Sequence, residues 1–520
     1  MPAQSSNQSE TITLFQWEGI NQSATRGLIE DQELYWLENM IPTAPGHLRT
    51  AWGPSAPIYT APGTTQILRI FFTNITGSNP SGFMFLSDGT VDRVDLNSGA
   101  VAHLGQIWQP VAPHFWAALK LWTPNQFGNT AGQVGGVVIG SPQGLYAVDG
   151  NDTVTAPGQT APLWLTDDNA GIPMPSGLPG IYALEVYQER LWVMGQTVIS
   201  FSAPSNGADF STAGGGGSFP YHGDQLTVSY TDLKAVGGFL YVFGDSCVQV
   251  ISYLTLSGQG TVTAPYTTTF LYSNVDPQNG QRFFRHVGVW SIALATWNGA
   301  GIFLLAGQSP MQVISEKIIN LLATLDTAPF EPTTTACDVF GQRWMLFNGT
   351  FKDPWGVSRS MLLCWNGKIW TVASQNLNLT HIGAWEQNSC IIPYGTDGQS
   401  LYRLFAQPDS NLKKHILTKA YRSPHLLMIN NWKRVFCEMH DETHGPEGVT
   451  VIGKLHTNGG NVPNGAQSVS YQLPPGTWDT LPHPTEGFGL SAALDLESLS
   501  PDFVMERIYF DYEERVRFGA

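Results

Sequence analysis

The chain has 520 residues, of which 13% are charged and 12% are aromatic, and its formal net charge is −16. Charged residues are about half as frequent as the ~25% usual in globular proteins, and with so many aromatic residues this excludes an intrinsically disordered chain. The acidic balance argues against a protein that grips DNA, because phosphate binding needs Lys and Arg clustered on one face.

The first residues, Met1 to Glu10, are polar and lack the basic and apolar regions of a signal peptide. No apolar run approaches the ~20 residues that span a bilayer, so we expect no membrane-spanning segment. The five cysteines are far apart and include no CxxC pair, which argues against a disulfide framework and a cysteine zinc site. We therefore expect assembly in a reducing cytoplasm, with no metal and no cofactor.

A pattern recurs along the middle of the chain, in which an apolar burst ends at a glycine and a second apolar burst follows. Runs of β-branched and aromatic residues bounded by Gly, Asn and Asp are typical of strands, and repeats of this length are typical of propeller blades. We expect each closing glycine to form a tight hairpin turn with positive φ. The glycines recur at intervals of 42–63 residues and are Gly89, Gly140, Gly195, Gly244, Gly307, Gly349 and Gly395.

This repeat predicts an all-β fold with a propeller-like core of six or seven blades over residues 61–410. An N-terminal arm with the first strands is expected over residues 1–60. The blade number stays open because the first and last units can share one blade. The alternative is a set of two or three packed sandwiches or barrels.

The pattern changes near residue 410, where longer alternating strands begin. We expect these strands at Arg434 to His440, Val449 to Leu455 and Arg507 to Tyr512. They predict a β-sandwich or β-rich collar over residues 411–520, either separate or closing on the N-terminal region. Six of the 25 basic residues gather at its start and are predicted to face a partner ring: Lys413, Lys414, Lys419, Arg422, Lys433 and Arg434.

Motifs that resemble catalytic or metal sites have simpler interpretations. His440 and His444 have the spacing of metalloprotease helices, but a strand precedes them and Gly-Pro follows, so we interpret them as part of a surface turn. Asp88 and Asp397 each precede a glycine, as in the Asp-box of sialidases, but the Trp that completes that motif is missing. Asp-Gly is ordinary hairpin chemistry. We therefore expect no catalytic residue and no enzyme.

Several short phrases occur in a fixed order along the chain: Trp17 to Asn21, Leu37 to Pro42, Gly46 to Arg49 with Gly53, Gly238 to Gly244, Val248 to Ile251, Ile314 to Ile319, and the Trp365 to Trp370 hairpin. In this order they resemble the packaged-DNA stabilisation proteins of short-tailed bacteriophages, also called tail hub or nozzle proteins. A fainter likeness lies at residues 490–512, and the Gly214 run and the acidic stretch near 470–500 depart from the family.

This resemblance implies a virion protein that forms a homohexameric ring in the phage tail. The ring would sit below the portal and its adaptor ring, near tail fibres or spikes. It would extend the DNA channel, retain the packaged double-stranded DNA and let it exit on infection.

The charge adds an expectation about that channel. A ring of acidic subunits predicts an acidic wall that the duplex passes without tight binding, because a basic wall would hold phosphates. Arg282 and Arg285 are candidate channel contacts, and a solvated loop face is their simpler interpretation.

The alternatives for the whole chain are a propeller adhesin that binds glycans and a tail enzyme that degrades polysaccharide.

Overall fold

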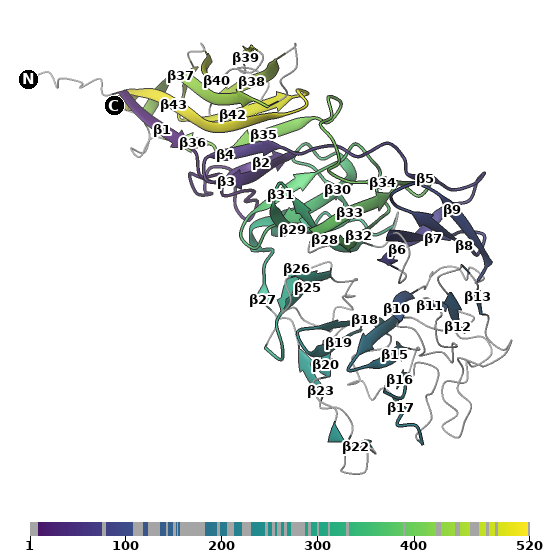
Figure 1. Ribbon diagram of the computed structural model, residues 1–520. Coiled ribbons are helices and arrows are strands. Elements are labelled where there is room, and N and C mark those ends of the chain that lie inside the picture. Colours follow the sequence, from purple (N-terminus) through teal and green to yellow (C-terminus); the bar gives the residue numbers. More distant parts are fainter. Residues whose placement is uncertain are drawn as a thin grey trace, which may run out of the picture.

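The computed structural model describes a molecule built almost entirely of strands (Figure 1). In the described part the helical residues form one short segment, the 3-10 turn Glu316–Ile318 followed by α1 (Ile319–Leu322). No helix in these ranges is long and apolar enough to cross a membrane. The described residues are 9–74, 80–107, 118–122, 136–141, 144–148, 152, 154–155, 183–194, 198–204, 213–220, 230–244, 248–251, 255–256, 262–264, 268–271, 287–289, 293–298, 301–309, 312–328, 332–387, 390–422, 428–442, 448–457, 467–474, 478–483 and 487–517.

Seven antiparallel blades of four strands each follow one another around a ring (Figure 1), so the predicted all-β propeller class is confirmed with seven blades. The first three blades are β6 (Ile67–Asn74), β7 (Pro80–Leu86), β8 (Thr90–Asp95) and β9 (Val101–Gln106); β10 (Ala118–Trp122), β11 (Gly136–Ser141), β12 (Gly144–Val148) and β13 (Val154–Thr155); and β14 (Ala183–Tyr187), β15 (Arg190–Met194), β16 (Val198–Phe201) and β17 (Gly217–Pro220).

The fourth to seventh blades continue in chain order. They are β18 (Tyr230–Val236), β19 (Phe239–Gly244), β20 (Val248–Ile251) and β23 (Thr268–Leu271); β24 (Val287–Val289), β25 (Ala293–Asn298), β26 (Gly301–Leu305) and β27 (Gln312–Val313); β28 (Thr333–Val339), β29 (Gln342–Lys352), β30 (Ser358–Trp365) and β31 (Trp370–Ala373); and β32 (His381–Gln387), β33 (Cys390–Thr396) and β34 (Ser400–Arg403), completed by β5 (Tyr59–Thr60). A small hairpin, β21 (Thr255–Leu256) with β22 (Val262–Ala264), lies outside the blades.

The ring closes through the N-terminal part of the chain. Strand β5 pairs with the edge of the seventh blade, with Ser400 opposite Thr60 and Leu401 opposite Tyr59. The Tyr59 hydroxyl donates to Asp92 Oδ2 on β8 of the first blade, at 2.6 Å. The strand that completes the last blade is therefore also bonded to the first blade.

The closing glycines of the repeat do not all form turns. Gly89 and Gly307 have positive φ, as predicted. The turn prediction is wrong for Gly140, Gly244, Gly349 and Gly395, which lie within β11, β19, β29 and β33. Gly195 lies outside the described residues. A Cβ at Gly349 would lie 2.8 Å from a ring carbon of Phe351, and one at Gly395 would lie 2.9 Å from Leu379. Packing rather than a turn requires glycine at these two positions.

The sixth blade continues into the C-terminal region as one sheet of ten strands, which we call the joint sheet. Its β31 pairs in parallel with an N-terminal strand, and C-terminal strands follow in the order β35, β42, β38 and β39, with β36 on β42. The added strands are β2 (Leu34–Glu38), β35 (Lys414–Thr418), β36 (Tyr421–Arg422), β38 (Val449–Thr457), β39 (Gln467–Leu473) and β42 (Ser491–Ser498).

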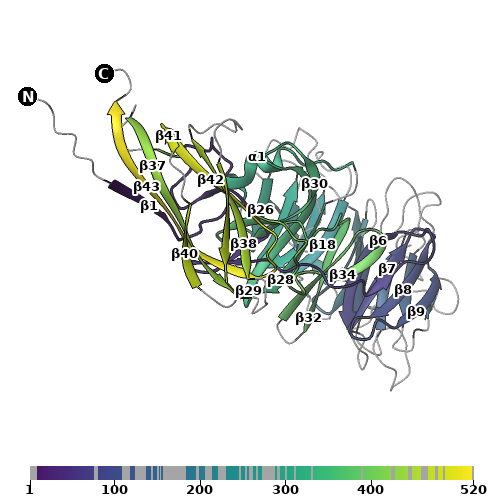
Figure 2. The same ribbon diagram turned by 90° about the horizontal axis from the view of Figure 1, so that it is seen from above.

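A seven-stranded sheet faces this extension and completes a sandwich. Its last strand, β43, pairs with β1, β4 and β37, and β1 and β43 lie side by side at the outer end of the sandwich (Figures 1 and 2). Its strands are β1 (Ser9–Leu14), β3 (Met40–Ala44), β4 (His47–Thr50), β37 (Met428–Asp441), β40 (Trp478–His483), β41 (Gly487–Gly489) and β43 (Phe503–Arg517).

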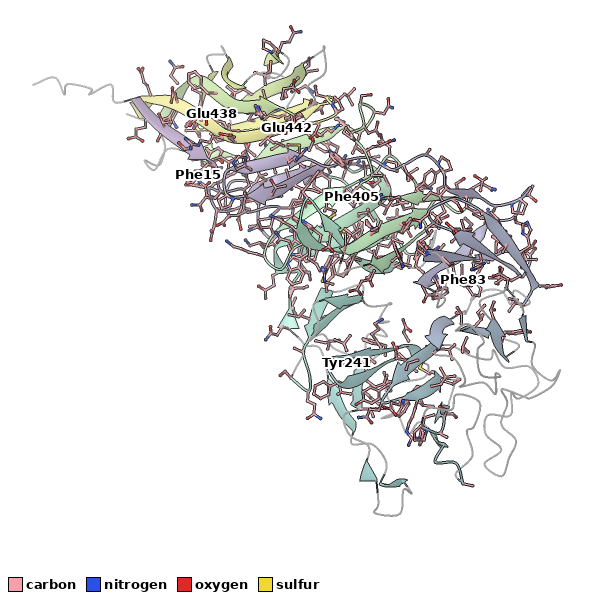
Figure 3. All side chains as sticks on the ribbon, in the orientation of Figure 1. Phe15, Phe83, Tyr241, Phe405, Glu438 and Glu442 are labelled. Carbon is pink, nitrogen blue, oxygen red and sulfur yellow. The ribbon has the colours of Figure 1, made fainter. Side chains whose placement is uncertain are left out.

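The core of the sandwich follows from the alternation of the sequence. Along β38 the residues alternate between buried and exposed or half-buried, because one face of the strand meets the opposite sheet. Inward residues of both sheets, including Leu494, Leu496, Cys437 and Phe510, share one apolar cluster. This cluster extends into the fifth and sixth blades, with Ile302 and Phe347 among its members. Smaller clusters lie between other neighbouring blades, and Phe83 and Tyr241 are fully buried members of two of them (Figure 3).

Candidate functional site at the propeller–sandwich joint

Segments that are far apart in the sequence meet where the propeller joins the sandwich. The Ile20 amide donates to the Trp370 carbonyl at 2.9 Å, and the Trp370 indole donates to the Ile314 carbonyl at 3.0 Å. Gly19 has φ +79, and a Cβ there would lie 2.4 Å from Ile369 Cγ2 and 2.6 Å from the Trp370 carbonyl oxygen. The close approach of these segments therefore requires glycine at position 19.

Asn39 directs the chain from the joint sheet into the opposite sheet of the sandwich. Its backbone has φ +55, a conformation that Asn tolerates better than most residues. Its amide donates to the Val372 carbonyl at 2.8 Å, and its side-chain nitrogen donates to Ser374 Oγ at 3.0 Å and to the Lys413 carbonyl at 2.6 Å. One residue thus bonds the N-terminal arm, the sixth blade and the C-terminal region.

A solvent-open pocket of about 360 Å³ lies on the outward face of this joint. The strand register places Glu38, His415, Glu497 and Ile452 in one row across β2, β35, β42 and β38. The first three of these residues line the pocket. Its other lining residues are Asp353, Trp355, Val357, Arg359 and Lys413.

One wall of the pocket is the turn between β29 and β30. Asp353 Oδ1 accepts the backbone amides of Trp355 at 3.0 Å and Val357 at 2.9 Å, so the carboxylate fixes the shape of the turn. Trp355 stacks on the His415 ring, with centroids 4.4 Å apart and planes 14° apart. Trp355 and Val357 nevertheless remain exposed.

The pocket contains an ion pair between a half-buried arginine and a buried glutamate. The Arg359 guanidinium binds both oxygens of Glu38, with Nη2 2.6 Å from Oε2, and its Nε lies 3.5 Å from Asp353 Oδ2. The Glu38 side chain is only 3% exposed and also accepts the Trp36 indole N–H. Burial alone would lower the pKa of Arg359, but Glu38 and Asp353 raise it above its ordinary value. Arg359 therefore stays charged at any physiological pH.

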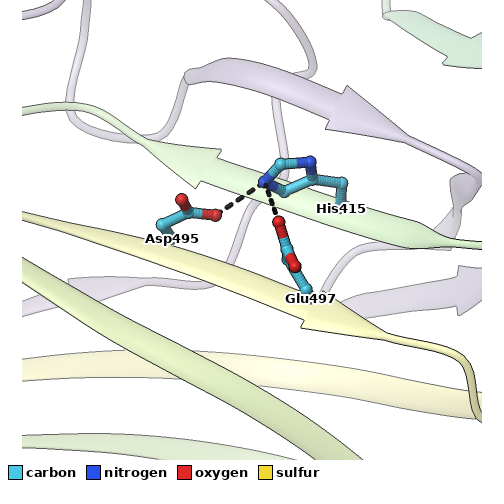
Figure 4. A group of neighbouring side chains, drawn as sticks. All are labelled: His415, Asp495 and Glu497. Atoms are coloured by element: carbon cyan, nitrogen blue, oxygen red, sulfur yellow. Dashed lines mark hydrogen bonds and ion pairs between the residues drawn. The ribbon is translucent and has the colours of Figure 1, made fainter. Parts of the chain in front are cut away.

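Next to this pair, one histidine lies between two carboxylates (Figure 4). His415 Nε2 is 2.6 Å from Asp495 Oδ1 and 3.6 Å from Glu497 Oε1. Asp495 Oδ2 also lies 3.7 Å from Nε2 of a second histidine, His456. Burial alone would raise the pKa of Asp495, but hydrogen bonds from His415 and His456 hold it well below its usual range. Asp495 is therefore an ionised hydrogen-bond acceptor at neutral pH.

These three residues have the donor atoms of a metal site. One ligand-type atom from each of His415, Asp495 and Glu497 lies within 4.8 Å of the other two. Imidazole nitrogen and carboxylate oxygen are both ligands for divalent transition metals. A second group in the described ranges, Glu18, Glu30 and Glu33, is purely acidic, and Lys317 already pairs with Glu33.

The basic residues predicted to face a partner ring have different environments. Lys414 is buried and donates to the Asp409 carbonyl at 2.7 Å, so its charge is used within its own subunit. Lys413 is half-exposed and lies 2.7 Å from Glu497 Oε1, and Lys419 lies 2.6 Å from Asp31. Arg422 is exposed. The side chains of Lys433 and Arg434 lie outside the described residues, although their backbone belongs to β37.

The other sequence candidates lie elsewhere. Arg282 and Arg285 are outside the described residues, so the channel prediction for them stays a prediction. His440 lies on β37 and is 2.8 Å from Glu442, which Figure 3 places on the sandwich. His444 is not described. Asp88 and Asp397 each accept nearby backbone amides within hairpin turns.

Sequence analysis missed the pocket because its residues are widely separated. His415 and Asp495 are 80 residues apart, and Glu38 and Arg359 are 321 apart. One signal was present in the sequence, since Asp495 and Glu497 share a strand face two residues apart. That spacing says nothing about the histidine on the neighbouring strand.

No family model and no curated protein matches the chain. Solved structures resemble it at low identity. The structure of BBS1N in complex with ARL6DN, soaked with lead, is 10% identical, with a TM-score of 0.40 over 68% of this chain and 97% of the other. The N-terminal domain of Nup159 is 10% identical, with a TM-score of 0.37 over 71% of this chain and 98% of the other.

A third similar structure is larger than this chain. PorZ of the type-IX secretion system of Porphyromonas gingivalis is 11% identical, with a TM-score of 0.35 over 82% of this chain and 48% of PorZ. None of these similarities bears on what the protein binds or does.

Proposed function

We propose that the chain is a structural subunit of the tail nozzle or hub ring of a short-tailed bacteriophage. In this role six copies form a ring below the portal and its adaptor. The ring extends the DNA channel, retains the packaged genome and lets it exit on infection, with tail fibres or spikes nearby. The subunit would act by position and shape rather than by catalysis.

The observation that carries this proposal is where the family-like phrases lie in the fold. Four of them, Trp17 to Asn21, Leu37 to Pro42, Ile314 to Ile319 and Trp365 to Trp370, contribute backbone or side chains to the joint. Short sequence similarities that arise by chance are not expected to lie next to one another in the folded chain. Their convergence supports the view that the resemblance follows one physical unit, the connection between propeller and sandwich.

The architecture also suits a ring subunit. The joint sheet continues one blade directly into the sandwich through backbone hydrogen bonds. A continuous sheet resists bending between the two parts better than a linker would. A subunit that lines a channel under DNA pressure needs this stiffness, because loose domains would let the ring widen.

Ring assembly gives the first test. Arg422 is an exposed cation of the C-terminal cluster, and Lys413 is half-exposed, so both can be reversed to Glu without burying a charge. We expect the R422E and K413E double variant to fold as a monomer but to add poorly to tails that carry the portal and adaptor. The matched control is K352E, which reverses an exposed cation on the sixth blade.

The measurement is the number of copies per tail by cryo-electron microscopy, with circular dichroism to check folding. Six copies of the unaltered chain per tail are expected. If the unaltered chain never joins tails, the proposed ring is wrong. If the double variant joins tails as well as K352E does, the proposed contact face is wrong.

DNA binding gives the second test. With −16 per chain, six copies carry about −96, and we propose an acidic channel wall that repels the duplex on all sides. The purified chain should bind free duplex more weakly than the roughly 10⁻⁴–10⁻⁶ M of ordinary non-specific binders. A gel shift with submicromolar affinity at physiological salt would reject the acidic channel. Hydrolysis of capsule polysaccharide would favour the tail enzyme instead.

A further inference from the structure

We propose that His415, Asp495 and Glu497 bind one divalent transition-metal ion, such as Zn²⁺ or Mn²⁺, at the joint between propeller and sandwich. This site goes beyond the proposed function, and the evidence for it does not depend on that function. The sequence predicts no metal, because these residues show no ligand spacing. Strand pairing alone brings them together.

The backbone holds the three residues in a nearly fixed arrangement. His415 and Glu497 are direct cross-strand partners on β35 and β42, and Asp495 lies two residues from Glu497 on the same face. One atom from each residue lies within 4.8 Å of the others. A tetrahedral ion with bonds of ~2.0–2.2 Å needs ligand atoms somewhat over 3 Å apart, so the side chains need to separate only slightly to admit it.

Neighbouring residues orient two of the ligands. Trp355 stacks on the imidazole at 4.4 Å and limits rotation of the His415 ring. His456 lies against the second oxygen of Asp495, leaving Oδ1 directed at His415. Outer groups that fix the orientation of ligands are a regular feature of protein metal sites.

Hydrogen-bond donors already occupy the place that an ion would take. The Nε2 proton of His415 lies between the imidazole and Asp495, and the Lys413 ammonium lies 2.7 Å from Glu497 Oε1. Asp495 and Glu497 carry two negative charges between them, which one divalent ion neutralises. When the ion binds, the imidazole proton moves to Nδ1 and Lys413 leaves Glu497.

The surroundings allow this exchange. The Lys413 side chain is 50% exposed and can turn into solvent, where its ammonium is fully hydrated. Glu497 and His415 border the 360 Å³ pocket, through which an ion can enter. Because the ion would bind β35 to β42 within the folded sandwich, it should stabilise the native state by mass action.

The test is a titration of the tag-free full chain with Co²⁺, followed by its visible absorption, and with Zn²⁺, followed by calorimetry. We expect one ion per chain and a thermal midpoint that rises with metal concentration. His415→Ala and Glu497→Gln should each weaken binding more than about tenfold. His440→Ala is the matched control, because that histidine also pairs with a carboxylate of the sandwich but has only one.

Lys413→Gln provides the sharpest test, since it keeps all three ligands and alters a half-exposed side chain. Removing the competing ammonium should tighten binding about two- to fivefold, the range of an exposed ion pair. The proposal is overturned if the unaltered chain shows no saturable binding, if His415→Ala binds as well as His440→Ala, or if Lys413→Gln binds no more tightly than the unaltered chain. The last outcome decides the matter even if His415→Ala fails to fold.

Discussion

The blades and the joint sheet are built from the same strands but by opposite routes. In the third blade, β14 to β17 follow one another within residues 183–220, and its first pairing joins Ala183 to Met194. In the joint sheet, β2 pairs with β31 and β35, so that Glu38 lies opposite Val372 and His415. One pairing closes a short loop, and the other closes loops of more than 300 residues.

This difference teaches where the molecule is vulnerable. A blade hairpin forms from local contacts and depends on its own few residues. The joint pairs strands from both ends of the chain, so its formation has to close loops of several hundred residues and costs more chain entropy. We therefore expect changes in the joint to destabilise the molecule as a whole, and changes in blade turns to have smaller, local effects.

The largest expected effect is at the ion pair between Arg359 and the buried Glu38. Arg359→Met leaves the Glu38 carboxylate buried and without its cation, which should lower the free energy of unfolding by about 3 kcal/mol. Lys413→Met, the control, removes a half-exposed partner of Glu497 and should cost less than about 1 kcal/mol. Urea denaturation measures both. Equal losses would mean that the joint is no more sensitive than the surface.

The second effect concerns close packing at the joint. Gly19→Ala places a methyl group against Ile369 and the Trp370 carbonyl at positive φ, which should cost about 2–3 kcal/mol. Gly46→Ala is matched in φ, +76 against +79, but has open space around it, so it should cost only about 1 kcal/mol. Thermal and urea unfolding of the two variants separate packing from backbone strain. A Gly46→Ala loss as large as that of Gly19→Ala would remove the packing argument.

The third effect tests the closure of the ring. Tyr59→Phe removes the 2.6 Å bond to buried Asp92 and should cost about 1–2 kcal/mol. Burial, together with the bond to Asp92, raises the pKa of the Tyr59 hydroxyl well above its usual range, so it is a donor at all working pH values. Tyr402→Phe, which loses a 3.0 Å bond to Asp397 within one hairpin, should cost less.

Hydrogen exchange locates the consequence of the closure variant. In Tyr59→Phe the amides of β5 and β34 should lose protection before those of the other blades. Uniform loss of protection over all seven blades would show instead that closure is not a separate step.

The smallest effect is a pH dependence at the joint. Burial lowers the pKa of Lys414 from 10.5 to about 8, although Asp409 and Asp502 partly offset this. Because the pKa is lower in the folded state, the unfolded chain binds more protons between these values, and stability contributed by Lys414 rises with pH. The contribution is complete above pH 10.5 and is lost as pH falls through about 8.

The unfolding free energies of the unaltered chain and Lys414→Met give the measurement. Their difference should shift by about 1 kcal/mol in favour of the unaltered chain between pH 8.5 and pH 9.5. A parallel pH response of the unaltered chain and Lys414→Met would mean that Lys414 is not buried as the structure has it.

The sequence alone determined the class of fold and, to within one, the number of blades. Apolar bursts separated by turn residues mark strands wherever neighbours in sequence are neighbours in space, as in β14 and β15. The strands predicted at Arg434 to His440, Val449 to Leu455 and Arg507 to Tyr512 lie within β37, β38 and β43 for the same reason. Alternation along a strand depends only on which side faces the core.

Only the tertiary structure decided which positions require glycine for packing and which side chains are buried. Gly349 and Gly395 have the spacing of turn glycines, but their strands lack room for a Cβ because Phe351 and Leu379 lie beside them. Lys414 belongs to a basic run in the sequence, yet its neighbour Lys413 reaches solvent and Lys414 does not. Adjacent residues on a strand point to opposite faces, and the pairing partners decide which face is buried. The row of Glu38, His415 and Glu497 exists only through such pairing, over separations that no local pattern can record.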